Sequence, residues 1–143
     1  MKESVRRREG REGRGDWQRL MRFFLELVTT LKLYHWLTQS YSRHVSTDSA
    51  HAKMQELSDR FMEVYLGRRG RPDLGRLPTP VSVKLRPSLL ADADVDLFRR
   101  KTEAFLLDTL PRFLDARRDC DLFAIRDEML ELLRRTAYLF ALR

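Results

Sequence analysis

Apolar residues recur at helical spacing in four separate stretches of the chain. The first stretch begins at Trp17 and continues through Leu20, Phe24 and Leu31 to about Thr38, and steps of three, four and seven residues are typical of an α-helix with a buried face. Further apolar residues widen this stripe over most of the helix circumference. Because such a helix is covered on more than one side, the pattern favours a subunit interface as well as a core.

The second stretch predicts a helix from about Asp48 to Leu66. Ser46 and Thr47, together with Asp48, offer an N-cap, and Gly67 offers a stop.

Two more helices are predicted in the second half of the chain, over residues 92–117 and 121–142. Pro111 should kink or break the third helix, because proline lacks a backbone N–H and its ring clashes with the preceding turn. No stretch shows the alternation of a strand, so the expected fold class is all-α.

A long basic connector separates the second and third helices. The segment from Gly67 to Pro87 holds four prolines, three glycines and six Lys or Arg residues against one Asp, which excludes a helix. Helices joined by short, long and short connections are typical of a ferritin-like antiparallel four-helix bundle, in which one long crossover links the second and third helices. We therefore expect a single domain over residues 16–143, with the crossover at 67–91.

The N-terminal residues 1–15 have the composition of a disordered basic arm. They contain six basic and three acidic side chains and no apolar run, so this segment is neither a signal peptide nor a membrane anchor. The single cysteine, Cys120, cannot form an internal disulfide. A reducing compartment fits best, and the expected location is the cytoplasm, a virion or a nucleoid rather than outside the cell.

The whole chain of 143 residues carries a formal net charge of +7. A basic protein favours an acidic partner such as nucleic acid or an anionic surface. No sequence-specific DNA-binding motif is evident, so DNA binding would be nonspecific, through phosphate contacts weakened by salt. The alternative is that these charges only keep the protein soluble.

Metal chemistry is the only enzymatic activity that the residues support. The chain has no Gly-rich phosphate loop, no pair of cysteines and no nucleophile elbow. The Glu-x-x-His pairs of a di-iron centre inside a bundle are also missing.

A different set of metal-binding side chains follows the second helix on its outer face. His44, Asp48, Asp59 and Glu63 fall within one sector of roughly 100° when each residue turns the helix by about 100°. Asp48 and Asp59 are about 16 Å apart along the axis. One ion therefore cannot contact both of these carboxylates within one chain.

A twofold axis would solve this problem. If two such helices pack antiparallel, the His44 and Asp48 end of one chain meets the Asp59 and Glu63 end of the other, which makes two identical sites. His35, at the end of the first helix, would join across the short turn. Mixed imidazole and carboxylate ligands suit iron(II), manganese or zinc.

This set of residues resembles the ferroxidase centre of the mini-ferritin family called Dps, DNA-binding proteins from starved cells. The resemblance rests on a motif with this spacing: His35–Trp36, then His44-x3-Asp48-x10-Asp59-x3-Glu63. It implies that His35, His44 and Asp48 of one subunit and Asp59 and Glu63 of a twofold-related subunit bind iron. The turn between His35 and His44 is shorter than is usual in that family.

The stretches LKLYHW and SDRFMEVYLGR are also similar to small Dps-like proteins of large DNA viruses and phages. Membership of the Dps family would imply a homo-oligomer, from a dimer up to a dodecameric shell, that oxidises iron(II) with peroxide or oxygen and stores the ferric product. Such shells sometimes coat DNA.

A second interpretation stays open. Carboxylates are common on the polar face of any amphipathic helix, His35 lies on an apolar stripe like many core histidines, and His51 fits a solvated surface. The chain would then be a non-catalytic ferritin-like structural protein of a virion, or one associated with nucleic acid through its basic arm.

Overall fold

The chain folds into a bundle of helices in the computed structural model, which describes residues 2–73, 82–85 and 91–142, with side chains from residue 16 onward. The four α-helices are α1 (Lys2–Leu37), α2 (Tyr41–Arg69), α3 (Val95–Ala104) and α4 (Cys120–Ala141). Within these described ranges no residue forms a strand, and the all-α prediction is confirmed.

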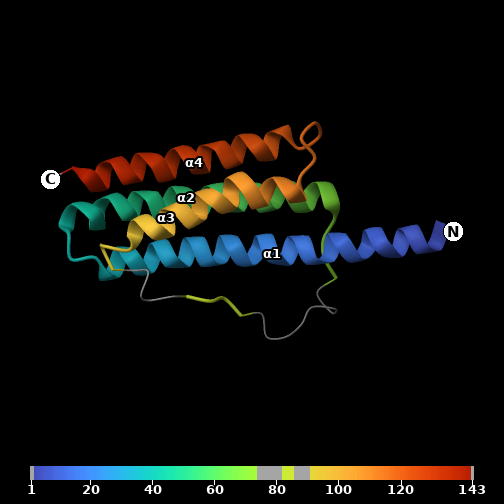
Figure 1. Ribbon diagram of the computed structural model, residues 1–143, viewed down its shortest axis with the longest axis horizontal. Helices are drawn as coiled ribbons and strands as arrows, with labels where there is room; N and C mark the ends of the chain where they lie inside the picture. Colours follow the sequence, from blue (N-terminus) through green and yellow to red (C-terminus); the bar gives the residue numbers. More distant parts are fainter. Residues whose placement is uncertain (1, 74–81, 86–90, 143) are drawn as a thin grey trace.

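The helices lie side by side along one long axis (Figure 1). α1 and α2 run in opposite directions, α3 runs in the direction of α2, and α4 returns in the direction of α1. α2 packs against both α1 and α4, and α3 contacts α4. As a result the turn between α1 and α2 and the C-terminal end of α4 lie at the same end of the bundle, and the N-terminal end of α1 projects past the other end.

The core forms where the predicted apolar faces meet. Burial of these side chains supplies most of the driving force for the association of the helices. The buried residues recur at the spacing of one helical face and are Leu20, Phe24, Leu27 and Leu31 on α1, Met54, Leu57 and Phe61 on α2, and Leu122, Ile125, Met129 and Leu133 on α4.

The first helix begins earlier than the apolar pattern indicates. Residues 2–15, for which the sequence predicts a disordered arm, form the first turns of α1 in the structure. These residues carry no apolar periodicity, which is why the pattern places the start near Trp17.

The predicted N-terminus of the second helix is wrong by seven residues. α2 starts at Tyr41, and the cap is Ser40, whose side chain accepts a hydrogen bond from the Arg43 backbone N–H. Ser46 and Thr47 lie inside the helix, where their hydroxyls donate to carbonyls four residues earlier at 2.8 and 2.6 Å. These residue types serve equally well as caps or as interior residues that bond back to the helix.

The predicted stop at Gly67 is also wrong. The helix continues to Arg69, and the glycine that ends it is Gly70, with φ at 82° and its N–H donated to the Leu66 carbonyl at 2.8 Å. Glycine adopts a positive φ without strain, so the helix ends at Gly70 and not at Gly67.

The third helix breaks close to the predicted position. α3 is followed by a π turn at Phe105–Thr109 and a 3-10 turn at Leu110–Phe113. Pro111, in the 3-10 turn, cannot donate the hydrogen bond that a continuing α-helix needs, and the break is confirmed. The fourth helix starts and ends within one residue of its predicted bounds.

A described segment of the connection between α2 and α3 lies beside α1. Residues 82–85 of this connection have no regular structure, and the Lys84 backbone N–H donates to the Glu26 carboxylate of α1 at 3.0 Å. The predicted crossover covers residues 67–91, of which 67–69 are helical, and its residues 74–81 and 86–90 lie outside the described residues.

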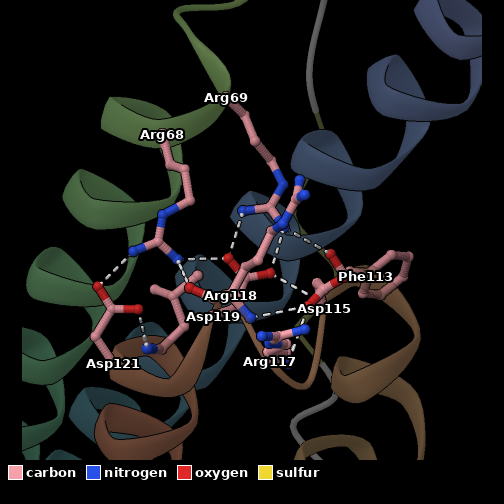
Figure 2. Close-up of polar contacts among 9 residues, drawn as sticks. Arg68, Arg69, Phe113, Asp115, Arg117, Arg118, Asp119 and Asp121 are labelled. Carbon is pink, nitrogen blue, oxygen red and sulfur yellow. Dashed lines mark hydrogen bonds and ion pairs between the residues drawn. The ribbon is translucent and has the colours of Figure 1, made fainter.

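A cluster of arginines and aspartates holds the far end of α2 to the turn before α4 (Figure 2). Asp119 is 1% exposed and receives hydrogen bonds from Arg68, from Arg69 at 2.7 Å and from the Asp115 backbone N–H at 2.7 Å. Burial alone would raise the pKa of the Asp119 carboxyl, but these hydrogen bonds outweigh it and lower the pKa to about 2. The other terminal nitrogen of Arg68, Nη2, donates a hydrogen bond to Asp121 Oδ2 at 2.7 Å.

Candidate metal centre

His35 and His44 face each other across the turn between α1 and α2. His35 lies in the last turn of α1 and His44 in the first turn of α2, and only three residues separate these helices. The two imidazole rings stack with their centroids 3.9 Å apart and their planes 21° from parallel.

Each histidine is held by the backbone of the other. Nδ1 of His35 lies 2.9 Å from the His44 carbonyl oxygen, and Nδ1 of His44 lies 2.8 Å from the His35 carbonyl oxygen. A carbonyl only accepts, so each Nδ1 carries the proton and donates it. In the neutral rings the lone pair is then on Nε2. This is the arrangement of a metal-binding histidine whose other nitrogen is fixed by a backbone carbonyl.

Asp48 lies one helical turn after His44 and completes a small cluster. Its Oδ1 atom is 3.8 Å from Nε2 of His35 and 4.0 Å from Nζ of Lys32. The Asp48 side chain is 64% exposed, whereas that of His35 is only 12% exposed. The structure therefore places His35 beside both Asp48 and His44.

Two further residues of this region, His51 and Lys32, were not among the ligands predicted from the sequence. His51, interpreted there as solvated surface, is half-buried, and burial lowers its pKa, with Lys32 and His35 acting in the same direction and Asp48 against it. Lys32 also lies with its ammonium 6.0 Å from the centre of the Trp36 ring. The spacing of His51, seven residues after His44 and three after Asp48, was the available signal, because it keeps all three on one face of α2.

Asp59 and Glu63 do not join this cluster within one chain. Both are exposed on later turns of α2, and the helical rise separates Asp48 from Asp59 by about 16 Å. In the described part of the chain no group of three or more His, Cys, Asp or Glu side chains is arranged to hold a metal ion. The imidazole and carboxylate groups of His35, His44 and Asp48 are of the types that bind iron(II), manganese or zinc, but a metal site here would need ligands from elsewhere.

Several large apolar side chains that lie close in sequence to His35 and His44 are exposed. Trp36 is 64% exposed, Tyr41 83% and Val45 51%, although large apolar side chains usually avoid water. None of the described helices is both long enough and apolar enough to span a membrane.

These features define an all-helical bundle protein with a stacked pair of histidines at one end. The chain belongs to a family of unknown function (DUF5856), which matches residues 35–140 and thus includes the histidine pair, α2 and α4.

The chain is also similar to an uncharacterised 14.6 kDa protein encoded in the mobD–ri intergenic region of Enterobacteria phage T4. The two are 41% identical over 66 residues, which cover 39% of this chain and 52% of the phage protein, about half of that relative's length. No solved structure is significantly similar to this chain.

Proposed function

We propose that this protein binds iron(II) between two copies of the chain and oxidises it, as a Dps-like ferroxidase. The observation that carries the proposal is the mutual hydrogen bonding of His35 and His44, which leaves both Nε2 lone pairs available to a metal ion beside the Asp48 carboxylate.

The remaining ligands would come from a second copy. Asp59 and Glu63 are exposed and stand one turn apart on α2, so an antiparallel pair of α2 helices would bring them to the histidines of the partner. Such a dimer would also cover the exposed side chains of Trp36, Tyr41 and Val45. A larger shell, up to a dodecamer, would be built from these dimers.

The arrangement of the helices supports a ferritin-like bundle. α1 and α2 form an antiparallel pair, α3 runs parallel to α2 (Figure 1), and Lys84 of the connection contacts α1 at Glu26. A single long crossover between the second and third helices produces these directions.

In the proposed reaction iron(II) is the substrate and peroxide the oxidant. Two iron(II) ions each lose one electron, the O–O bond of one hydrogen peroxide molecule breaks, and two protons are taken up to give two water molecules. His35, His44 and Asp48 would orient iron(II) through Nε2 and carboxylate oxygens, and Asp59 and Glu63 would balance its charge. Manganese(II) or zinc(II) would bind to the same donors.

Anaerobic titration with iron(II), followed by peroxide, tests this proposal. Wild type should bind iron(II) and oxidise it rapidly, and Asp59→Ala should lose oxidation and keep its helical content, because the Asp59 side chain is exposed. Glu131→Ala, an exposed carboxylate on α4, is the matched control and should behave like wild type. Wild-type oxidation by Asp59→Ala would contradict the assignment.

A second candidate is a non-catalytic bundle that contacts nucleic acid, as part of a virion or a nucleoid. Its support is the end of the molecule opposite the histidines, where Arg71, Arg117 and Arg118 are exposed beside the end from which the basic N-terminal part of α1 projects (Figure 1). This function predicts salt-dependent retention of DNA that survives Asp59→Ala and is lost when residues 1–15 are deleted.

A further inference from the structure

A cavity of about 220 Å³ lies between the helices at the end of the bundle that carries the α1–α2 turn. All four helices contribute to its wall. Most of the wall is apolar, with Leu31 from α1, Met54 from α2, Phe98 from α3, and Leu133, Ala137 and Phe140 from α4. Tight packing usually leaves few spaces of this size in a small bundle.

The polar groups of the cavity gather around Tyr34 and Asp92. Tyr34 is 2% exposed, its hydroxyl donates to Asp92 Oδ1 at 2.7 Å, and Thr38 donates to the same oxygen at 2.8 Å. Arg43 donates to the Tyr34 hydroxyl and to the Asp92 carbonyl, each at 3.1 Å. An ionised carboxylate offers about four acceptor positions, so that Asp92 retains room for a further donor.

The charges at the rim balance one another. Arg43 lies 3.8 Å from the Asp92 carboxylate, and Arg99 is paired with Asp96 at 2.7 Å and also with Glu103. Because both guanidinium groups already have carboxylate partners, a charged ligand would find no free counter-charge against the mostly apolar wall, which is costly. The cavity therefore suits an uncharged molecule.

The volume of the cavity limits the size of the ligand. An apolar cavity of about 150 Å³ accommodates benzene, so a cavity half as large again has room for two fused rings. We propose that this cavity binds a small uncharged aromatic molecule of about the size of indole, whose single hydrogen-bond donor is accepted by Asp92. The proposal is independent of the metal site, since no cavity residue is one of the proposed ligands.

Calorimetric titration with indole tests the proposal, with EDTA present so that metal binding plays no part. Indole should bind saturably with one site per chain. Benzothiophene, which has the same shape but no N–H, should bind about three to ten times more weakly, and the anion indole-3-acetate should not bind. Equal binding of indole and indole-3-acetate would contradict the charge argument, and no saturable binding of indole would overturn the proposal.

A cavity-filling substitution locates the site. Ala137→Phe, on the wall, should weaken indole binding at least tenfold, whereas Ala124→Phe, exposed on the same helix, should leave it unchanged. Ala137→Leu serves if the larger side chain prevents folding. Unchanged indole binding in a folded Ala137 variant would refute this location. If wild type binds no indole and the Ala137 variant changes its oligomeric state, the cavity would instead accommodate a partner copy, and the proposal would be overturned.

Discussion

Single residues around His35 and His44 set the electrostatics of the proposed metal site. The two Nδ1 atoms are occupied by backbone carbonyls, and His51 lies near enough for Asp48 and His35 to affect its pKa. The ammonium of Lys32 is the nearest fixed positive charge, 4.0 Å from Asp48 Oδ1. A metal ion at this carboxylate would therefore be repelled by Lys32.

We predict that Lys32→Met tightens metal binding. Methionine keeps the aliphatic length of the side chain and removes the charge, so the affinity for zinc(II) at low ionic strength should rise about three- to tenfold, and less at high salt. Titration calorimetry measures this change. Lys53→Met is the control, because Lys53 pairs with Glu56 on α2. Weaker binding in Lys32→Met would mean that Lys32 positions Asp48 instead of competing with the metal.

At the scale of whole elements, the joints between helices depend on polar contacts at the helix ends. The histidines join α1 to α2, and Asp119 joins the end of α2 to the start of α4 through two arginines (Figure 2). Removal of one partner from such a pair leaves the other charges without compensation. Both arginines are about one-third exposed, so that water limits the loss.

We predict that Asp119→Asn destabilises the protein by about 2 kcal/mol at neutral pH, as expected for a carboxyl whose pKa falls from 3.8 to about 2 on folding. A group with a depressed folded pKa stabilises the protein above its unfolded pKa. The difference between wild type and Asp119→Asn should therefore be constant above about pH 5 and disappear as the pH falls from 4 to 2.

Urea denaturation at a series of pH values measures this difference. Asp121→Asn is the control, because Asp121 shares Arg68 but is exposed, and its effect should be much smaller. A pH-independent gap between wild type and Asp119→Asn would show that the contact stabilises by packing and not by charge.

At the scale of the whole molecule, the proposed site requires two chains. His44 lies in the first turn of α2 and Asp59 and Glu63 lie on distant later turns of the same helix, so that each proposed site takes His44 from one chain and Asp59 from the other. Complementation between two inactive variants follows from this geometry.

We predict that His44→Ala and Asp59→Ala are each inactive alone and partly active when mixed and refolded together. Random pairing makes about half of the dimers mixed, and each mixed dimer holds one intact and one doubly altered site, so about a quarter of the wild-type oxidation should return. Peroxide-dependent oxidation of iron(II) measures the recovery. Absence of recovery, in a mixture shown to contain mixed dimers, would argue for a site within one chain.

The helices and their buried faces could be predicted from the sequence, because residues three or four apart share a helical face whatever surrounds them. The same rule placed His44 and Asp48 together, and the short turn brought His35 to them. It failed at Ser40 and Gly70, because several nearby residues could serve equally well as caps.

The sequence by itself determined the all-helical class, the break at Pro111 and the residues that form the buried face of each helix, since these depend on neighbours within a few positions. Only the tertiary structure decided how the histidines exchange hydrogen bonds, that His51 and Lys32 adjoin Asp48, that Asp119 is buried between two arginines, and that a cavity lies beside Tyr34. These features join residues from different helices, and they depend on how far each helix is shifted and rotated against its neighbours, which no local spacing specifies.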